Sequence, residues 1–585
     1  MTTPAYPEGP RTAAGLLAAT QAAHQAGRLD EAESGYRRLL ETDPDHADAL
    51  HLLGVVRHQR GDEGAAVALI GRAIALGNDN HKSHYNRATA LQALGRLDEA
   101  LAGYQRAAAL APTLVAVRLA LAQLLHRLGR LDDAAAAYRV ALGQTPEDGA
   151  LHFALGTVLQ AAGRLEEAEE SYRCALDHRQ DHAPTLVNLG TVLHARGRLD
   201  QAAACHRRAV AAEPGFVPAH LNLGAVLQAQ GRLFDAVKSY RRVLALAPAE
   251  ATAHFNLGCA VQAVGWLDEA VRCYREACRL APDYAEAHNN LGQCLEARGL
   301  LAEAVAVHRR ACALSPDRVA FHNNLACALY LLHRRDPAAA GAEVAAWLAA
   351  HPDQPIARHM ARALTGSGPP PPQPPATYVR TLFDGFAASF ERELLGIGYC
   401  GPRLMAEAFA RILPVPAADR AVLDAGCGTG LCAPELRPWA RTLTGVDVSP
   451  AMLEHARRRA LYDTLVAADL SDYLPAHADT FDLIAAADVL CYFGDLESVI
   501  AGLSAALRRD GALAFTVEQA PDPDRPFALA AHGRYLHGET ALRATLARHG
   551  LTAAHLWVAN LRDEDGRPSP NLVVLAIRGR LARPK

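Results

Sequence analysis

Glycine residues at alternate positions follow an apolar run that ends in Asp424. The loop reads Gly426-Cys427-Gly428-Thr429-Gly430. Since its glycines lack a Cβ, the loop can turn tightly while a ligand lies directly on its backbone. The next apolar run, residues 442–447, ends in Asp447. A doubly wound sheet places an acidic residue at this point to bind the two hydroxyl groups of a ribose. The spacing therefore predicts a site for a ligand that contains a nucleoside.

The glycine spacing does not fit the dinucleotide fingerprint Gly-x-Gly-x-x-Gly, because Leu431 occupies the position of its third glycine. The run Asp-Ala-Gly-Cys-Gly-Thr-Gly instead resembles the loop that binds S-adenosylmethionine in class I methyltransferases. That ligand has no pyrophosphate and so does not require the third glycine. The resemblance implies S-adenosylmethionine as cofactor and methyl transfer as the reaction. The alternative is a glycine-rich turn that binds no ligand.

The resemblance also implies roles for individual positions. Asp424 and the loop glycines would lie beside the methionine part of the cofactor, and Asp447 would accept both ribose hydroxyls. Asp469 would contact the adenine amino group, whereas Met452 would pack either on the adenine or in the core. The residues implied in cofactor binding are Asp424, Gly426, Cys427, Gly428, Gly430, Asp447, Met452, Asp469 and Leu470.

Three polar residues in the second half of this region are candidates for a proton acceptor: Asp488, Glu518 and His537. Methyl transfer from a sulfonium is an in-line displacement, so the enzyme aligns the reactants and needs no covalent nucleophile. A protonated acceptor requires a base, and the sequence does not rank the three. The segment Asp488-Val-Leu-Cys differs from the Asn/Asp-Pro-Pro-aromatic loop of DNA amino-methyltransferases, which disfavours DNA as acceptor. No metal site is predicted.

Apolar runs alternate with helical stretches from Tyr378 onward, which predicts an α/β domain with a doubly wound, Rossmann-like parallel sheet. The runs are residues 421–425, 442–447, 464–468, 481–487 and 511–517, and a final pair, 555–559 and 572–577, fits the antiparallel end of the class I methyltransferase fold. Three phenylalanines at helical spacing precede the sheet and would form either a lid over the site or part of the core. They are Phe383, Phe386 and Phe390.

The first 350 residues repeat with a period of 34, as the glycines Gly27, Gly61, Gly95, Gly129, Gly163, Gly197, Gly231, Gly265 and Gly299 show. In each unit the glycine ends one helix, a Leu-Asp/Glu-x-Ala segment opens a second, and a proline follows in most units. The pattern resembles the tetratricopeptide repeat, with ten units over residues 13–352. Stacked units form an α-solenoid with a concave face. In the tenth unit His333 and Ala342 replace the usual glycine and tyrosine, as suits a terminal cap.

Asparagines recur at the sixth position of five consecutive units: Asn188, Asn222, Asn256, Asn290 and Asn324. This position lies on the first helix of a unit and faces the concave groove. An asparagine offers both a donor and an acceptor, which matches a peptide backbone. The run resembles the asparagine ladder of the O-linked N-acetylglucosamine transferase superhelix and implies a protein or peptide partner in the groove. The alternative is that asparagine simply suits this position of the repeat.

Histidines recur at the same interval or its multiples: His152, His220, His254, His288 and His322. Equivalent positions on stacked units lie roughly 8–10 Å apart, whereas a zinc ion needs ligands within ~2.1 Å. The histidines are therefore expected to pack or to line the groove rather than to bind a metal.

A proline-rich segment, residues 366–376, separates the two halves and is expected to be a semi-rigid spacer. The expected domains are the repeats at 13–352 and a methyltransferase domain at 377–580 with a core of its own. Net charge is −4, so a broad basic surface for nucleic acid is not expected. No apolar stretch approaches the ~20 residues of a membrane span. Twelve cysteines without a Cys-x-x-Cys pair fit reduced thiols, hence a cytoplasmic location. The oligomeric state cannot be inferred.

The sequence thus predicts an S-adenosylmethionine-dependent methyltransferase whose repeats recruit a protein or peptide. Two alternatives stay open. One is an interaction scaffold whose methyltransferase half no longer turns over, and the other is a small-molecule methyltransferase that its repeats localise. The sequence does not identify the methyl acceptor.

Overall fold

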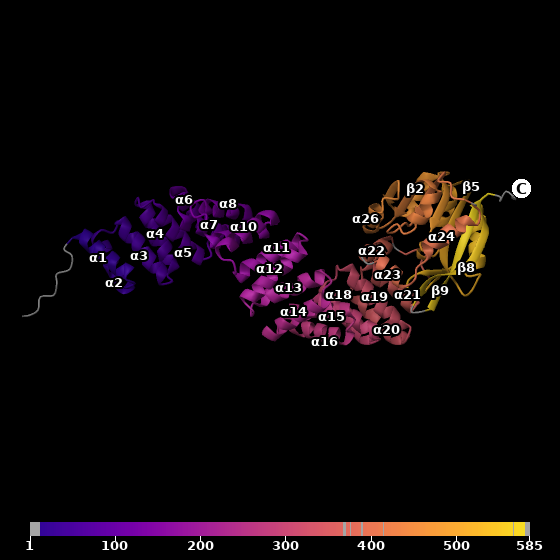
Figure 1. Ribbon diagram of the computed structural model, residues 1–585, viewed down its shortest axis with the longest axis horizontal. Coiled ribbons are helices and arrows are strands. Elements are labelled where there is room, and N and C mark those ends of the chain that lie inside the picture. The colour runs from indigo at the N-terminus through magenta and orange to yellow at the C-terminus, as the bar shows by residue number, and fades with distance from the viewer. Residues whose placement is uncertain are drawn as a thin grey trace, which may run out of the picture. The chain divides into compact units, whose positions relative to one another are not determined.

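The computed structural model describes residues 12–366, 370–374, 376–387, 390–413, 415–564 and 567–579. The chain divides into two compact units, Met1–Ala260 and Val261–Lys585, and the boundary falls inside the repeat region. The second unit therefore contains the last repeats together with the sheet domain. Among the described residues, no helix has the length and apolar character needed to span a bilayer. Figure 1 labels the helices and strands.

Helix pairs form the α-solenoid that the 34-residue period predicts. The first helices of the pairs are α1 (Ala13–Gln25), α3 (Ala47–Gln59), α5 (His81–Ala93), α7 (Val115–Arg127), α9 (Gly149–Ala161), α11 (Ala183–Ala195), α13 (Val217–Ala229), α15 (Ala251–Val264), α17 (Ala285–Ala297) and α19 (Val319–His333). The second helices are α2 (Leu29–Thr42), α4 (Glu63–Ala75), α6 (Leu97–Leu110), α8 (Leu131–Leu142), α10 (Leu165–His178), α12 (Leu199–Ala212), α14 (Leu233–Leu246), α16 (Leu267–Leu280), α18 (Leu301–Leu314) and α20 (Pro337–Ala350). A further helix, α21 (Pro355–Thr365), follows the tenth pair.

In the first nine units the repeated glycine ends the first helix in a left-handed conformation, with φ between 72° and 94°. Gly95 is representative. Its N–H donates to the Gln92 carbonyl, and the N–H of Arg96 donates back to the Leu91 carbonyl at 2.9 Å. These bonds satisfy carbonyls that the end of a helix leaves open. The glycine period therefore sets the length of every unit.

A second glycine, on the first helix, receives an aromatic ring from the second helix. A Cβ at Gly224 would lie 2.5 Å from the ring of Tyr240, and one at Gly156 would lie 2.7 Å from the ring of Tyr172. Both tyrosines are fully buried. In two units a buried histidine replaces the tyrosine, and burial lowers the pKa of one of them, His206, to about 4. The glycine that follows two residues after Asn188, Asn222 and Asn290 thus has a packing reason.

The recurring histidines bind main-chain carbonyls. The Nε2 of His152, His220, His254, His288 and His322 lies 2.8–3.2 Å from the carbonyl oxygen of the proline six residues earlier. Each histidine therefore fastens the loop that precedes its own helix. This is the packing role that the spacing predicts.

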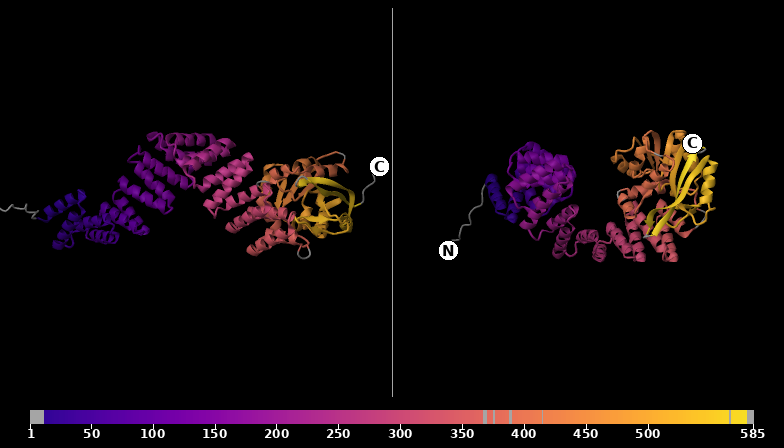
Figure 2. Two further views of the ribbon diagram at one scale, coloured as in Figure 1. Left: turned by 90° about the horizontal axis from the view of Figure 1, so that it is seen from below. Right: turned by 45° about the vertical axis from the view of Figure 1, so that its right-hand side comes forward.

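The strands form one sheet in the order β3-β2-β1-β4-β5, all parallel, with β9 antiparallel to β5 and β8 antiparallel to β9. The strands are β1 (Arg420–Ala425), β2 (Ala440–Asp447), β3 (Thr464–Ala467), β4 (Phe481–Ala486), β5 (Leu507–Gln519), β8 (Leu551–Glu564) and β9 (Arg567–Arg578). The prediction of a parallel sheet with a final antiparallel pair is confirmed. Figure 2 shows the long β8–β9 pair in yellow.

Two short strands were not expected from the sequence. They are β6 (Ala528–Leu529) and β7 (Tyr535–His537), and β7 pairs with the end of β5. Both are too short to show an alternation of apolar and polar residues. They form a hairpin whose turn comprises residues 530–534.

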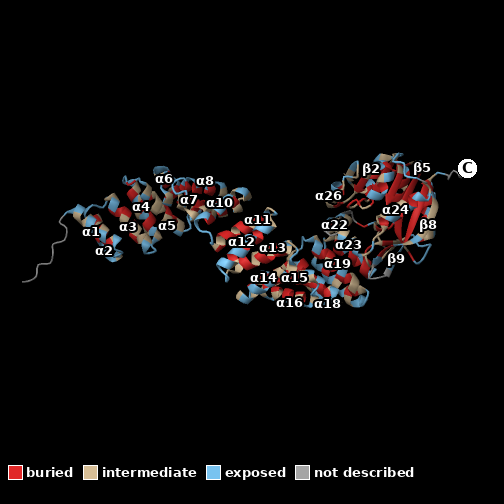
Figure 3. Ribbon diagram, viewed as in Figure 1, coloured by how far each residue is buried: buried red, intermediate tan, exposed pale blue. Residues whose placement is uncertain are grey.

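Helices cover both faces of the sheet, and two clusters of buried side chains lie beneath them. One face carries α24 (Gly401–Ala410) and α25 (Ala433–Leu436). The other carries α27 (Leu470–Tyr473), α28 (Glu497–Ala506) and α29 (Glu539–Arg548), while α26 (Pro450–Arg458) follows β2. Figure 3 shows the strands buried between helices with exposed outer faces. The sheet domain therefore has the core that the sequence predicts.

A third cluster of buried side chains joins the last repeats to the segment before the sheet. It contains Trp347, Met360 and Leu364 of the repeat end and Tyr378 of α22 (Ala376–Phe386). Residues 367–369 and 375 of the proline-rich segment lie outside the described residues. In the described part, the N–H of Asp495 donates to the Pro372 carbonyl at 2.6 Å. The described part of the expected semi-rigid spacer therefore contacts the sheet domain through Pro372.

Candidate cofactor and acceptor pocket

The glycine loop follows β1 and turns beside the end of β2. The N–H groups of Gly426 and Cys427 both donate to the Val446 carbonyl, at 2.7 and 3.0 Å. Gly426, Gly428 and Gly430 all have positive φ angles. A Cβ at Gly426 would lie 2.4 Å from Val489, whereas one at Gly428 would meet only Phe390, at 3.9 Å. The loop therefore needs glycine for its conformation and leaves open space above Gly428 for a ligand.

Asp447 connects the end of β2 to this loop. Its Oδ2 accepts the N–H of Gly428 at 2.8 Å, and its Oδ1 accepts the N–H of Ser449 at 2.9 Å. Burial raises the pKa of the Asp447 carboxyl above its ordinary value. Each oxygen retains a lone pair for a further donor. The carboxylate is thus held in place and can still accept the hydroxyl groups of a ribose.

Asp424 lies beneath the loop and is 1 % exposed. Its Oδ2 accepts the hydroxyl of Tyr462 at 2.6 Å. Burial raises the pKa of Asp424 to about 7. The pocket walls do not include Asp424 or Gly430. These two residues shape the loop from below.

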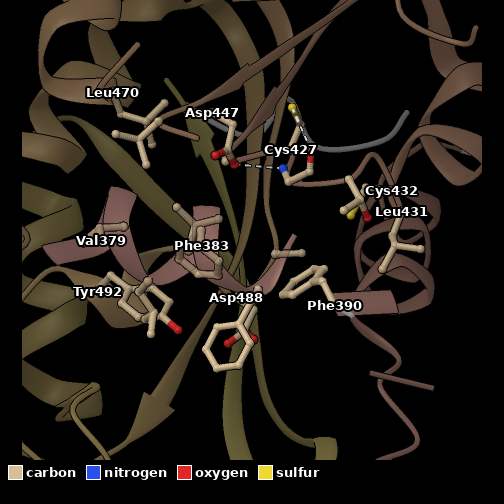
Figure 4. A pocket seen from close by; sticks show the side chains of 18 of the residues that line it. Val379, Phe383, Phe390, Cys427, Leu431, Cys432, Asp447, Leu470, Asp488 and Tyr492 are labelled. Atoms are coloured by element: carbon tan, nitrogen blue, oxygen red, sulfur yellow. Dashed lines mark hydrogen bonds between the residues drawn. The ribbon is translucent and has the colours of Figure 1, made fainter. Parts of the chain in front are cut away.

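A cavity of about 290 Å³ opens at the carboxyl ends of the strands (Figure 4). Sites for small molecules typically measure ~300–1,000 Å³. The sequence-predicted residues that line it are Gly426, Cys427, Gly428, Asp447, Asp469, Leu470 and Asp488. Met452 of α26 is 1 % exposed and does not line it. The structure thus places Met452 in the core, one of its two proposed locations.

The phenylalanines before the sheet line the same cavity. Phe383 and Phe386 of α22 and Phe390 of α23 (Phe390–Gly396) are among its walls. Two polar contacts fasten these helices to the loop side. Ser449 Oγ donates to Asp384 at 2.5 Å, and Arg459 donates to Glu391 at 2.7 Å. The structure therefore favours a lid over the pocket for this segment.

Asp488 stands at the other end of the cavity. Its φ is +59°, and its N–H donates to Thr516 Oγ1 at 2.8 Å. Strained backbone of this kind is concentrated at functional sites. The Oδ2 of Asp488 accepts a hydrogen bond from Arg562. A carboxylate already bound by a guanidinium is better suited to orient a polar acceptor than to remove its proton.

Glu518 belongs to a buried ionic network behind the pocket wall. It pairs with Arg534, with Arg562 at 2.8 Å and with His532 at 3.2 Å. Burial by itself raises the pKa of Glu518, but Arg534 and the neighbouring cations lower the pKa well below its ordinary value. Glu518 does not line the cavity. Its expected role as a base is therefore not supported, because it holds Arg534 and Arg562, which do line the cavity.

His537 is 1 % exposed and lies outside the cavity. Burial lowers the pKa of its imidazole to about 4. The ring borders a separate hollow with Leu496 and Leu542. The proposal of His537 as a base is thus not supported by its position. The neutral ring is part of the interior beneath β7.

His537 is expected to make the sheet domain less stable as the pH falls from about 6.5 to about 4. In this window the unfolded chain binds a proton that the folded chain excludes. The free energy of unfolding therefore falls as the pH falls. Since one pKa unit corresponds to ~1.4 kcal/mol, the loss between pH 7 and pH 5 is about 2 kcal/mol. Urea unfolding of the full-length protein at both pH values would measure it, in the transition that unfolds the sheet domain. His537→Gln should show a smaller loss, and an equal loss in both proteins would contradict the assignment.

Several pocket residues could not be inferred from the sequence. Arg534 comes from the turn between β6 and β7, and Arg562 from the long strand β8. Tyr399 and Tyr492 also line the cavity. Arg534 stands between Gly533 and Tyr535, and Arg562 stands before Asp563, so nothing local distinguishes either arginine from one at the surface. Among the described residues, no group of three His, Cys, Asp or Glu side chains is arranged to bind a metal ion.

The five repeated asparagines lie half-buried on first helices. Asn188 donates to the Tyr172 hydroxyl at 3.3 Å, and Asn324 donates to the Asn289 carbonyl oxygen at 2.9 Å. Their role in peptide binding stays a prediction.

Family models match both halves of the chain. A methyltransferase domain matches residues 423–515, and tetratricopeptide repeats match residues 17–81, 85–149, 147–212, 217–283 and 255–319. Methyltransferase-like protein 27 of Homo sapiens is 38% identical over 105 residues, 18% of this chain and 43% of that protein. Trans-aconitate 2-methyltransferase of Paracidovorax citrulli is 40% identical over 119 residues, 20% of this chain and 44% of that protein. The chain thus spans less than half the length of either relative.

Among solved structures, the crystal structure of MamA covers 28% of this chain and 94% of its own, with 23% sequence identity and a TM-score of 0.27.

Proposed function

Because the chain joins tetratricopeptide repeats to a C-terminal methyltransferase domain, we propose that it transfers the methyl group of S-adenosylmethionine and that its repeats recruit a protein or peptide. The observation that carries the cofactor proposal is the contact between Asp447 and the N–H of Gly428. It places a half-buried carboxylate that lines the cavity against an open glycine loop, where a doubly wound sheet binds a ribose.

The residues of the pocket divide the proposed work. The glycine loop and Asp447 bind the cofactor, which supplies an electrophilic methyl group when bound. The aromatic side chains of α22 and α23 exclude water from the cavity. Asp488, fixed by Arg562, lies at the end of the cavity away from the loop and orients the acceptor. Alignment of this kind is the main contribution that a displacement needs from the protein.

A second candidate is a methyltransferase for a small molecule. The cavity measures about 290 Å³ and has an aromatic lid. Such a space admits a small acceptor or one protruding side chain, but not a folded surface. A small molecule and a protein side chain would contact the same residues of the pocket, so the pocket does not distinguish them. The preference for a polypeptide acceptor rests on the repeats, which form a surface suited to binding one.

Methyl transfer in a host lysate tests the proposal. Full-length protein and tritiated S-adenosylmethionine are added to lysate, and the products are separated into protein and small-molecule fractions. Label in a protein band supports the first proposal, and label in a metabolite supports the second. No label above a control without the protein would contradict both and would favour a scaffold that does not turn over.

A further inference from the structure

The end of the repeat region touches a turn of the sheet domain. The Nε2 of His359, in α21, lies 2.8 Å from the carbonyl oxygen of Gly533, to which it donates. The same imidazole stacks on Tyr378, with ring centroids 4.0 Å apart. Tyr330 of α19 meets the ring of His532 edge-on at 6.0 Å. Two helices of the repeat region therefore hold the turn at residues 530–534.

The fit at this contact is close. Gly533 has a φ of +86°, and a Cβ there would lie 3.0 Å from Met360 Sδ and 3.1 Å from the Tyr378 hydroxyl. Ala531, two residues earlier, packs against the cluster that the last repeats share with α22. The turn is thus packed against the repeat end and does not project into solvent.

The next residue of the turn faces the pocket. Arg534 lines the cavity and donates through Nε to Glu518. Glu518 also accepts from Arg562, and Arg562 in turn binds Asp488. A continuous series of contacts therefore runs from His359 through the turn to the acceptor end of the pocket. The flanking strands β6 and β7 contain two and three residues, so they add little to fix the turn.

We propose that Tyr330 of the last repeat and His359 of the helix that follows it are positioning residues for methyl transfer, because they hold the turn that places Arg534 in the pocket. The inference rests on the proposed methyltransferase function. It makes the last repeats part of the acceptor site, in addition to any partner that they recruit. The cofactor end of the pocket, at the glycine loop, makes none of these contacts.

The test uses variants of the full-length protein. His359→Phe keeps a ring against Tyr378 but removes the donor to Gly533, and His359→Gln keeps a donor without the ring. Gly533→Ala disturbs the same contact from the other side. His288→Phe is the matched control, since it removes a similar bond, 3.2 Å from the Pro282 carbonyl, within a repeat. The readouts are hydrogen exchange of residues 528–537, the dissociation constant of S-adenosylhomocysteine, and the initial rate of tritium transfer into the labelled lysate fraction.

In His359→Phe and Gly533→Ala we expect exchange of residues 528–537 to accelerate about 10-fold and the transfer rate to fall about 10-fold or more. The dissociation constant of S-adenosylhomocysteine should stay within about 2-fold, a split that general unfolding would not produce. His359→Gln should restore most of the rate, and His288→Phe should resemble wild type.

Three results would overturn the inference. They are unchanged exchange in His359→Phe, a wild-type transfer rate in that variant, or an equal loss of rate in His288→Phe. If wild-type protein itself transfers no methyl group, the proposed function fails and this inference fails with it. If wild type transfers label and His359→Phe transfers it equally well, only the positioning role fails.

Discussion

Replacement of Asp447 by alanine is expected to weaken the binding of S-adenosylhomocysteine about 10- to 100-fold. A hydrogen bond to a charged group contributes ~1.5–3 kcal/mol, and the variant loses the acceptor for the ribose. It also loses the bonds from the N–H groups of Gly428 and Ser449, which hold the loop in its open shape. Isothermal titration calorimetry on the full-length protein measures the dissociation constant.

A matched control separates this effect from a general loss of structure. Asp482, at the start of β4, accepts the N–H of Ala421 at 2.8 Å and pairs with Arg508 at 3.0 Å. It is equally well bonded but lies at the opposite end of its strand from the pocket. Asp482→Ala should lower the melting temperature while the dissociation constant stays within about 2-fold. An unchanged dissociation constant of S-adenosylhomocysteine in Asp447→Ala would contradict the proposal that Asp447 binds the ribose hydroxyls.

The second large effect is expected in the repeats. Replacement of Asn188, Asn222 and Asn256 together by alanine should weaken the binding of a protein partner about 10-fold or more. Each hydrogen bond from an asparagine to a peptide backbone contributes ~0.5–1.5 kcal/mol. All three lie within the first compact unit, on α11, α13 and α15. They are half-buried, so their removal should change the melting temperature little.

Pull-down from lysate with quantitative mass spectrometry compares the triple variant with wild type. Asn86 has the same phase in the third unit but stands apart from the consecutive run, and its amide lies 3.0 Å from the His51 ring. Asn86→Ala alone should therefore retain the partners. Equal recovery of the same partners by the triple variant, with unchanged melting, would show that asparagine is only a packing preference of the repeat.

The parts that the sequence predicts correctly depend on local rules. The glycine of each repeat needs a positive φ, and that need recurs every 34 residues. The loop at Gly426–Gly430 and the carboxylate of Asp447 follow directly from the strands that precede them. These features are encoded within a few residues of where they act, and for that reason a single sequence shows them.

The acceptor end of the pocket depends on distant contacts. Arg534 reaches Glu518 from a short hairpin, and Arg562 reaches it from near the end of a long strand. His359 approaches Gly533 across 174 positions of sequence. The periodicity of a short segment does not predict such contacts, because the packing of whole helices and strands determines which distant residues meet. The contact between Asp495 and Pro372 is of the same kind, and for that reason the proline-rich segment was expected only to be a semi-rigid spacer.

The most direct test of the account compares the transfer of tritium from S-adenosylmethionine by wild-type protein and by Asp447→Ala, in the same lysate and at a cofactor concentration near the wild-type dissociation constant. Wild type is expected to label an acceptor, and the rate in Asp447→Ala is expected to fall about 5- to 50-fold, because a site that binds 10- to 100-fold more weakly is mostly empty at this concentration. Equal rates in the two proteins, or no transfer by a wild-type protein that binds S-adenosylhomocysteine, would contradict the account.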